Sequence, residues 1–227
     1  MPNIFLVLGY GIPKNILKDD NYNFYLKTVF NKIFSVVIKD KNAKPMIFFC
    51  GGKTDMYKPY KRNEADEMIR FFNTSIKQKP FLIQITKNWR FVSEKESLST
   101  LENLLYSKKI IAQRKIKKAN LFIFCEQTRE NRIKILAKKI FHKQFRIQVT
   151  PVDFDTSANR YLSPEFIGKK ERSELKHSFW ALQSQENLKK HHEFFVEKID
   201  YLRKAGPRAH VDAVKKLWEK NFKESYK

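Results

Sequence analysis

The sequence predicts an α/β fold in which a mainly parallel sheet carries helices on both faces. As far as residue 155, short apolar runs rich in β-branched and aromatic residues alternate with longer segments of helical periodicity. Strands joined through helices in this order form right-handed crossovers, and repeated crossovers build a parallel sheet. From about Pro164 onward the pattern changes to helices alone. We therefore expect an α/β body followed by a helical extension.

The first predicted strand is the run NIFLVLG, which ends at Gly9, and an apolar stripe of helical spacing follows it from Tyr22 to Val37. The second strand, PMIFFCGG, ends at a pair of glycines. Asn63 then has a side chain suited to cap the next helix, NEADEMIRFFNTSI. The runs PFLIQIT and WRFVSE predict one or two further strands.

The next helix start is predicted in the stretch SEKESLSTLEN, residues 93–103. Its segment STLE has the form of a capping box, in which the Ser99 side chain accepts a hydrogen bond from the N–H of Glu102. The Glu102 carboxylate in turn reaches back to the N–H of Ser99. The run NLFIFCE predicts the following strand, a helix through Ile133 and Ile140 comes next, and FRIQVTPVDF predicts the last strand.

The segment beyond Pro164 contains two apolar stripes, which the sequence AGP at residues 205–207 separates. The stripes are Leu188, Phe195, Ile199 and Leu202, and Val211, Val214, Trp218 and Phe222. We expect residues 1–163 to form the α/β domain and residues 164–227 to form a basic helical extension packed on it. Because both stripes contain aromatic residues that require burial, packing is the first interpretation, and an appendage that binds a partner is the second.

The composition is that of a globular chain large enough to bury a core: 227 residues, of which 42% are hydrophobic. No apolar run approaches the roughly 20 residues that cross a bilayer, and the N-terminus lacks the features of a signal peptide. We therefore expect a soluble protein in the cytoplasm or another intracellular compartment. Cys50 and Cys125 lie in no C-x-x-C pattern, and the histidine spacings predict no metal site, so buried free thiols are expected.

The chain is strongly basic, with 46 Lys and Arg against 24 Asp and Glu and a formal net charge of +22. Such a charge indicates a polyanionic partner, which includes nucleic acid, an acidic membrane surface or a highly phosphorylated ligand. Compositional drift is the alternative, because AT-rich genomes encode chains rich in Lys, Asn, Ile and Phe. Both explanations remain open from the sequence.

Four of the six glycines follow the first two predicted strands, namely Gly9, Gly11, Gly51 and Gly52. Glycine permits positive φ and close approach of the backbone to a ligand, and the carboxyl edge of a parallel sheet is where α/β proteins bind ligands. The GYG sequence is not a complete G-x-G-x-x-G fingerprint, because residue 14 is Lys, and no P-loop is present. The placement predicts a ligand-binding edge of another kind.

The order of these motifs is similar to that of the SanA/ElyC/YdcF-type family, also known as domain of unknown function 218. The similarity covers roughly residues 3–155, and its most specific part is a Glu-x-x-Ser-x-x-Thr-x-Glu-Asn motif. Cys50 stands where the family usually has Ser, and Arg129 stands where it usually has His. The residues that fit the family pattern are Gly51, Gly52, Glu64, Ala65, Glu94, Ser97, Thr100, Glu102, Asn103 and Arg132.

The resemblance implies a Rossmann-like domain with a pocket for an anionic or nucleotide-like small ligand, and S-adenosylmethionine has been suggested within the family. Arg132 is expected to bind an anionic group of the ligand with help from Arg129, because guanidinium groups offer forked donors. The alternative is a basic structural or nucleic-acid-binding protein that kept the fold and lost any catalytic activity. The expected ligand-binding residues are Gly9, Gly11, Gly51, Gly52, Glu64, Glu94, Ser97, Thr100, Glu102, Asn103, Arg129 and Arg132.

Overall fold

The structure is a computed structural model that describes residues 1–39, 44–154 and 162–224, with the backbone alone for residues 207 and 222–224. The chain divides into two compact units. Unit 1 consists of Met1–Asp55 and Lys61–Phe154, and unit 2 consists of Met56–Tyr60 and Asp155–Lys227.

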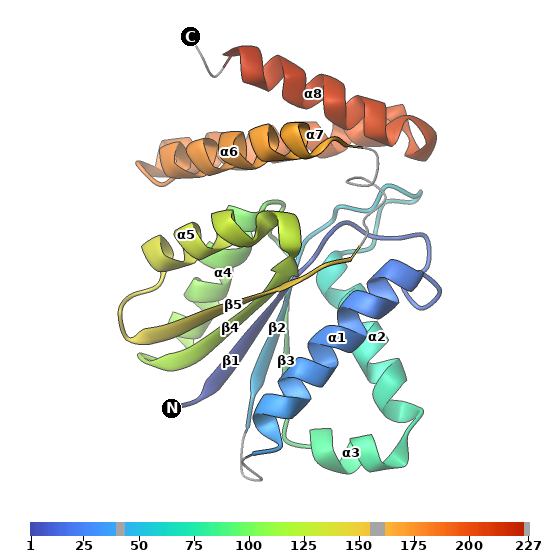
Figure 1. Cartoon of the computed structure of the whole chain (residues 1–227), viewed down its shortest axis with the longest axis vertical. Coiled ribbons are helices and arrows are strands. Elements are labelled where there is room, and N and C mark those ends of the chain that lie inside the picture. Colours follow the sequence, from blue (N-terminus) through green and yellow to red (C-terminus); the bar gives the residue numbers. More distant parts are fainter. Residues whose placement is uncertain (40–43, 155–161, 225–227) are drawn as a thin grey trace. The chain divides into compact units, whose positions relative to one another are not determined.

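Unit 1 contains a five-stranded sheet in the order β3-β2-β1-β4-β5, and all its strand pairs are parallel (Figure 1). This confirms the predicted α/β fold class. The order also means that the chain reverses its direction of travel across the sheet between β1 and β4, which is where ligands bind in open α/β sheets. The strands are β1 (Asn3–Leu8), β2 (Met46–Cys50), β3 (Arg90–Glu94), β4 (Ala119–Glu126) and β5 (Phe145–Val152).

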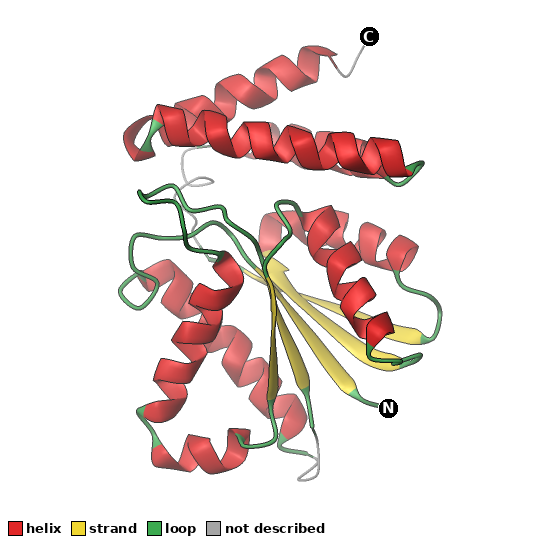
Figure 2. Cartoon of the chain, turned by 180° about the vertical axis from the view of Figure 1, so that it is seen from behind, coloured by secondary structure: helices red, strands yellow, loops and turns green. Residues whose placement is uncertain are grey.

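Helices cover both faces of this sheet (Figure 2). Because crossovers are right-handed, connections that run from β1 towards β3 place their helices on one face, and connections that run back towards β5 place theirs on the other. The first face carries α1 (Asp20–Val37), α2 (Glu64–Lys77) and α3 (Pro80–Thr86), and the second carries α4 (Thr100–Gln113) and α5 (Glu130–Ile140). In the described part of the chain, no helix is both long and apolar enough to cross a membrane.

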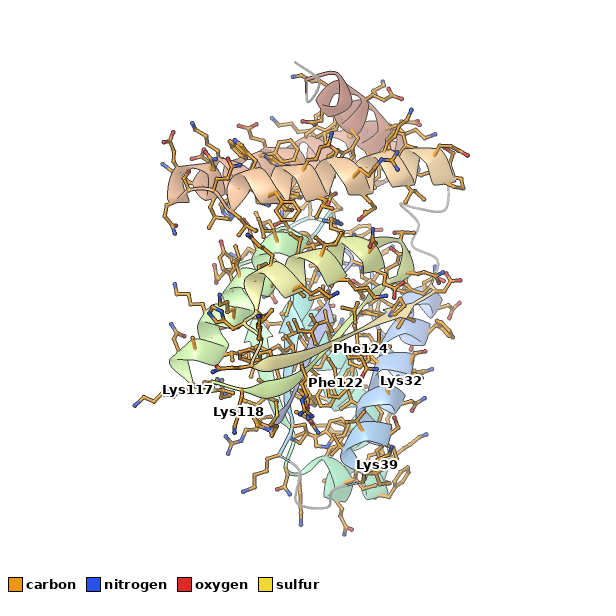
Figure 3. The ribbon with its side chains drawn as sticks, turned by 60° about the vertical axis from the view of Figure 1, so that its left-hand side comes forward. Lys32, Lys39, Lys117, Lys118, Phe122 and Phe124 are labelled. Carbon is orange, nitrogen blue, oxygen red and sulfur yellow. The ribbon has the colours of Figure 1, made fainter. Side chains whose placement is uncertain are left out.

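Aromatic side chains dominate the core between the sheet and the first helical layer. Phe49 of β2 meets Phe72 of α2 edge to face, with ring centroids 4.8 Å apart. Phe122 and Phe124 lie on β4 (Figure 3), where Phe122 is half-buried and Phe124 is buried. Both rings stack on Phe5 of β1. Such ring pairs add to the stabilisation that burial of their area provides.

Both cysteines are buried free thiols, as predicted. Cys50 Sγ lies 3.2 Å from the hydroxyl oxygen of Ser107, which joins β2 to α4 on the second face of the sheet. Burial raises the pKa of Cys125 to about 12 and that of Cys50 well above its ordinary value. Neither thiol is therefore a reactive thiolate at neutral pH.

The predicted helix starts are confirmed by their caps. The Asn63 side chain accepts a hydrogen bond from the N–H of Asp66, and Ser99 Oγ accepts one from the N–H of Glu102 at 3.2 Å. The Glu102 carboxylate, which is fully buried, accepts a hydrogen bond from the N–H of Leu98 at 2.6 Å. Leu98 is the residue just before the cap Ser99.

The run PFLIQIT is a helix, α3, so its prediction as a strand was wrong. Pro80 occupies the first turn of this helix, where its missing N–H has no cost. The buried positions, Leu82 and Thr86, are one helical turn apart, and the Thr86 hydroxyl donates to the carbonyl of Leu82. A short continuous apolar run cannot be assigned by periodicity alone. Three large apolar side chains stay exposed, namely Phe81 (59%), Ile83 (50%) and Ile85 (38%).

Unit 2 is helical, with α6 (Pro164–Ala181), α7 (Gln185–Ala205) and α8 (His210–Glu224) among its described residues. The two apolar stripes predicted α7 and α8 but not α6. The buried positions of α6 are polar or small, so they produce no apolar stripe: Lys170, Glu174, Ser178 and Ala181. Gly206, at φ +77°, ends α7 where the AGP sequence predicted a break, and the side chain of Phe222 lies outside the described residues.

Candidate functional site

The carboxyl ends of three neighbouring strands are joined by backbone hydrogen bonds. The N–H of Gly9, after β1, donates to the carbonyl of Cys50 at 2.9 Å. The N–H of Gly51 donates to the carbonyl of Glu94 at 2.9 Å, and that of Gly52 donates to the carbonyl of Ser97 at 2.7 Å. The glycine loops and the start of the segment 94–103 therefore lie together at one edge of the sheet.

Glu64, the first residue of α2, lies at the centre of this edge and is only 6% exposed. Its Oε1 accepts hydrogen bonds from the N–H of Gly11 at 2.6 Å and from the hydroxyl of Thr54. Its Oε2 accepts no hydrogen bond within the described residues. One carboxylate oxygen is thus held in place, and the other is left for a further partner.

The glycines give this carboxylate its space. A side chain on Gly9 or Gly51 would overlap the Glu64 carboxyl group, and one on Gly52 would put its Cβ 2.6 Å from the Ser97 carbonyl oxygen. Gly11 has open space but a φ of +90°, a conformation that favours glycine. Three of the four glycines are therefore required by the packing of the protein's own atoms: Gly9 and Gly51 make room for Glu64, and Gly52 makes room for the turn after β3.

Burial raises the pKa of Glu64, because desolvation disfavours the charged form. The hydrogen bonds from Thr54 and Gly11 and the charge of Arg129 oppose this shift, whereas the nearby Glu94 adds to it. Glu64 therefore keeps its proton to a higher pH than an exposed glutamate does.

A second buried carboxyl, Glu94, ends β3 and holds the turn that follows. Its Oε1 accepts hydrogen bonds from the N–H groups of Glu96 (3.0 Å) and Ser97 (3.1 Å), and its Oε2 lies 2.5 Å from Ser97 Oγ. The Ser97 hydroxyl is also hydrogen-bonded to the Asn103 amide. The Ser97 hydroxyl has one proton, so it can donate in only one of these two contacts. In the other contact the proton comes from the Glu94 carboxyl or from the Asn103 amide. Burial raises the pKa of Glu94, which favours its protonated form.

Thr100 and Asn103 lie in the first turn of α4, and both are buried. The Thr100 hydroxyl and the Nδ2 atom of the Asn103 amide make no hydrogen bond within the described residues. Polar groups at a helix N-terminus, beside free N–H groups, suit an anionic or hydroxyl-bearing ligand. The Glu102 carboxylate, by contrast, accepts the hydrogen bond from Leu98 that fixes the start of the helix.

The arginines follow β4, as predicted. Arg129 ends the short turn Gln127–Arg129, and its guanidinium carbon lies 3.5 Å from the centre of the Tyr10 ring. The Tyr10 hydroxyl donates to the Glu126 carboxylate at 3.0 Å, so the loop after β1 is joined to the end of β4. Arg132, the third residue of α5, is buried, and its charge opposes the rise in the pKa of Cys125 that burial causes. Arg129 thus lies beside Tyr10, and its charge opposes the rise in the pKa of Glu64 that burial causes.

Two tyrosines of α1 shape the site and were missed as site residues. The Tyr22 hydroxyl accepts a hydrogen bond from the N–H of Tyr10 and donates one to the carbonyl of Gly11, both at 2.7 Å. The Tyr25 hydroxyl donates to the carbonyl of Leu8 at 2.9 Å. In the sequence Tyr22 belongs to an apolar helical stripe, which indicates only a core position, and Tyr25 stands outside that stripe. Their place near the start of α1, at the carboxyl edge, was the available signal.

A partly buried ion pair, also missed, ties together the loops around the site. Arg62 Nε and Nη2 lie 2.9 and 2.8 Å from the two carboxylate oxygens of Asp55, which is 1% exposed. Arg62 Nη1 donates to the carbonyls of Pro13 and Lys14. Thr54 is thereby held next to Glu64. Loop residues that meet only in the folded chain leave no periodic pattern, so the sequence offered no signal for this pair.

Within the described ranges, no group of three or more His, Cys, Asp or Glu side chains could hold a metal ion. Comparisons of the chain with protein-family models, curated proteins and solved structures find no match. Most of the motif residues from which the sequence predicted a resemblance to the SanA/ElyC/YdcF-type family lie around Glu64 and Glu94, and the resemblance itself stays a prediction.

Proposed function

We propose that the carboxyl edge of unit 1 binds a small nucleotide-like ligand, as the resemblance to SanA/ElyC/YdcF-type proteins implies. Glu64 carries the proposal. Its carboxylate is buried, one oxygen is oriented by two donors, and the other accepts no hydrogen bond within the described residues. A buried carboxylate with an unused oxygen is costly unless a partner completes it.

The free oxygen of Glu64 suits a ligand hydroxyl. A carboxylate that receives the hydroxyls of a ribose is the usual way in which parallel α/β sheets hold adenosine-bearing ligands. The raised pKa of Glu64 also suits transfer of a proton to or from a bound group. S-adenosylmethionine is the candidate that the resemblance supplies, and its ribose and positive charge both fit an edge with several carboxylates.

The anionic part of the ligand would lie towards the arginines. Arg129 covers the Tyr10 ring next to the glycine loop, and α4 and α5 both begin at this edge with their free N–H groups. A guanidinium group and helix N-termini together favour a carboxylate or phosphate. We expect Arg132 to bind this group and Arg129 to assist.

The test is native mass spectrometry of the purified protein for retained small molecules, followed by calorimetric titration with S-adenosylmethionine and with adenosine monophosphate. Glu64→Gln should weaken the binding of at least one of these probes about tenfold, because the amide is a weaker acceptor. Glu67→Gln is the matched control, since Glu67 lies on the same helix but pairs with Arg70 at 2.6 Å. Equal affinities for wild type and Glu64→Gln would contradict the proposal, as would the absence of binding by either probe.

A further inference from the structure

The amino edge of the sheet in unit 1 is strongly basic. There the strands begin and α1, α2, α4 and α5 end, because each helix runs back antiparallel to the strands (Figure 1). Lys39, Lys117 and Lys118 extend from this half of unit 1 (Figure 3). The exposed cations of the amino edge are Lys39, Lys44, Lys77, Lys79, Lys87, Arg90, Arg114, Lys115, Lys117, Lys118 and Lys143.

These cations have no carboxylate partner within the described residues. The described residues of segments 38–45, 77–90, 113–118 and 141–146 contain no Asp or Glu at all. The carboxylates of unit 1 gather instead at the other edge, where Glu64, Glu94 and Glu126 lie. Exposed lysines such as Lys14 and Lys18 also lie at the carboxyl edge, so the amino edge is distinguished by cations without carboxylates among its described residues.

Large apolar side chains are exposed at the same edge. Phe81, Ile83 and Ile85 of α3 are 59%, 50% and 38% exposed, and Ile38, at the end of α1, is 55% exposed. Lys79 and Lys87 flank α3 on either side in the chain. Exposed phenylalanine and isoleucine beside lysines are the features of a surface that lies in a membrane interface.

We propose that the amino edge of unit 1 docks on an anionic lipid bilayer. The apolar side chains of α3 enter the boundary between headgroups and acyl chains, and the surrounding lysines contact the anionic headgroups. Nucleic acid explains the charge but not the isoleucines, because aliphatic side chains cannot stack on bases as aromatic rings do. In this arrangement the carboxyl edge, at the opposite end of the sheet, faces away from the membrane.

The test is flotation of the full chain with vesicles of phosphatidylcholine containing about 30% phosphatidylserine, compared with pure phosphatidylcholine vesicles. Binding should require the anionic lipid and should fall as salt is added. Lys117→Gln with Lys118→Gln should lower the partition coefficient about thirtyfold. Phe81→Gln should lower it about tenfold, because the apolar ring no longer enters the bilayer.

Matched controls come from the other edge. Lys14→Gln with Lys18→Gln removes the same charge from exposed positions in the loop between β1 and α1, and Phe24→Gln removes a phenylalanine that is 55% exposed near the start of α1. Both controls should bind vesicles as the wild type does. All of these side chains are exposed, so thermal melts should show folded variants.

Equal binding to both kinds of vesicle, or an equal loss in the control variants, would overturn the proposal. The proposal would also be overturned if the protein bound a fluorescent single-stranded oligonucleotide tightly, with Phe81→Gln leaving that binding unchanged, and bound no vesicles. That outcome would identify nucleic acid as the partner of the basic edge.

Discussion

At the carboxyl edge of the sheet, Glu64, Glu94 and Glu102 are buried and accept hydrogen bonds from backbone N–H groups. At the amino edge, cations such as Lys117 and Lys118 are exposed and have no carboxylate partner within the described residues. The direction of the helices accounts for part of this difference. Helix N-termini gather at the carboxyl edge and favour anions, and C-termini gather at the amino edge and favour cations, by about 0.3–1 kcal/mol each.

The two edges differ in how their charges fit the helix dipoles. Exposed lysines at helix C-termini cost little. A helix N-terminus should lower the pKa of Glu64, yet burial outweighs that effect and raises it. The ionised carboxylate of Glu64 therefore lowers the stability of the fold. A residue kept at such a cost is typical of a functional site.

The largest effect is expected from Gly52→Ala. The added Cβ would lie 2.6 Å from the carbonyl oxygen of Ser97 and 3.0 Å from that of Lys95, and a backbone oxygen cannot move aside as a side chain does. We expect a loss of about 3 kcal/mol in the free energy of unfolding, measured by urea denaturation.

Gly168→Ala is the control for Gly52→Ala. Gly168 lies inside α6, and its nearest neighbour is the flexible end of Arg172 at 3.4 Å. Alanine there should stabilise the protein by about 0.5–1 kcal/mol. Equal behaviour of the two variants would show that the edge does not pack around its glycines as described.

Arg132→Ala should weaken binding of S-adenosylmethionine or adenosine monophosphate by about 1.5–3 kcal/mol, the range for a hydrogen bond to a charged group. The measurement is calorimetric titration, with thermal melts to separate binding from folding. Arg114→Ala, at the exposed amino edge, should leave the affinity unchanged. An unchanged affinity in Arg132→Ala would remove this arginine from the proposed site.

Ser99→Ala should lower the free energy of unfolding by about 1 kcal/mol, because the N–H of Glu102 loses its cap. Ser35 is the comparison, since its exposed hydroxyl donates only to the Lys32 carbonyl inside α1. Ser35→Ala should be neutral or slightly stabilising, because alanine is the better helix former. A loss in Ser99→Ala no larger than that in Ser35→Ala would contradict the capping role.

The smallest effect on stability is expected at the amino edge. Lys117→Gln with Lys118→Gln should change the free energy of unfolding by no more than about 0.5 kcal/mol, because both side chains are exposed. Relief of repulsion among neighbouring cations would make the change slightly stabilising at low salt. Urea denaturation at two salt concentrations measures this. A loss above 1.5 kcal/mol, which is about a tenfold change in the equilibrium constant, would show that these lysines are structural.

The sequence predicted the features that are local or periodic. The parallel strands followed from apolar runs, and the starts of α2 and α4 followed from Asn63 and Ser99, because a cap is decided within four residues. The helix α3 was mistaken for a strand, since a seven-residue apolar run lacks a clear period.

The interior of the site could be predicted only in part. The motif pointed to Glu64, Glu94, Ser97 and Asn103, which the structure brings to one edge. It did not show that the glycines make room for Glu64, because that contact joins three separate segments. Nor did it show Thr54 or Tyr22 as hydrogen-bonding groups, since neither stands in a pattern that differs from an ordinary loop or core position.

The most direct test of the central claim is the pH dependence of unfolding in wild type and Glu64→Gln. A carboxyl whose pKa is raised by folding binds more protons in the folded state, so its contribution to stability falls as pH rises from the ordinary glutamate value of about 4.3 through the raised value. Glutamine does not titrate, so Glu64→Gln should become more stable relative to wild type as pH rises from the ordinary pKa to the raised pKa. Parallel curves for the two proteins would show that Glu64 is not a desolvated charge, and the account of the carboxyl edge would fail.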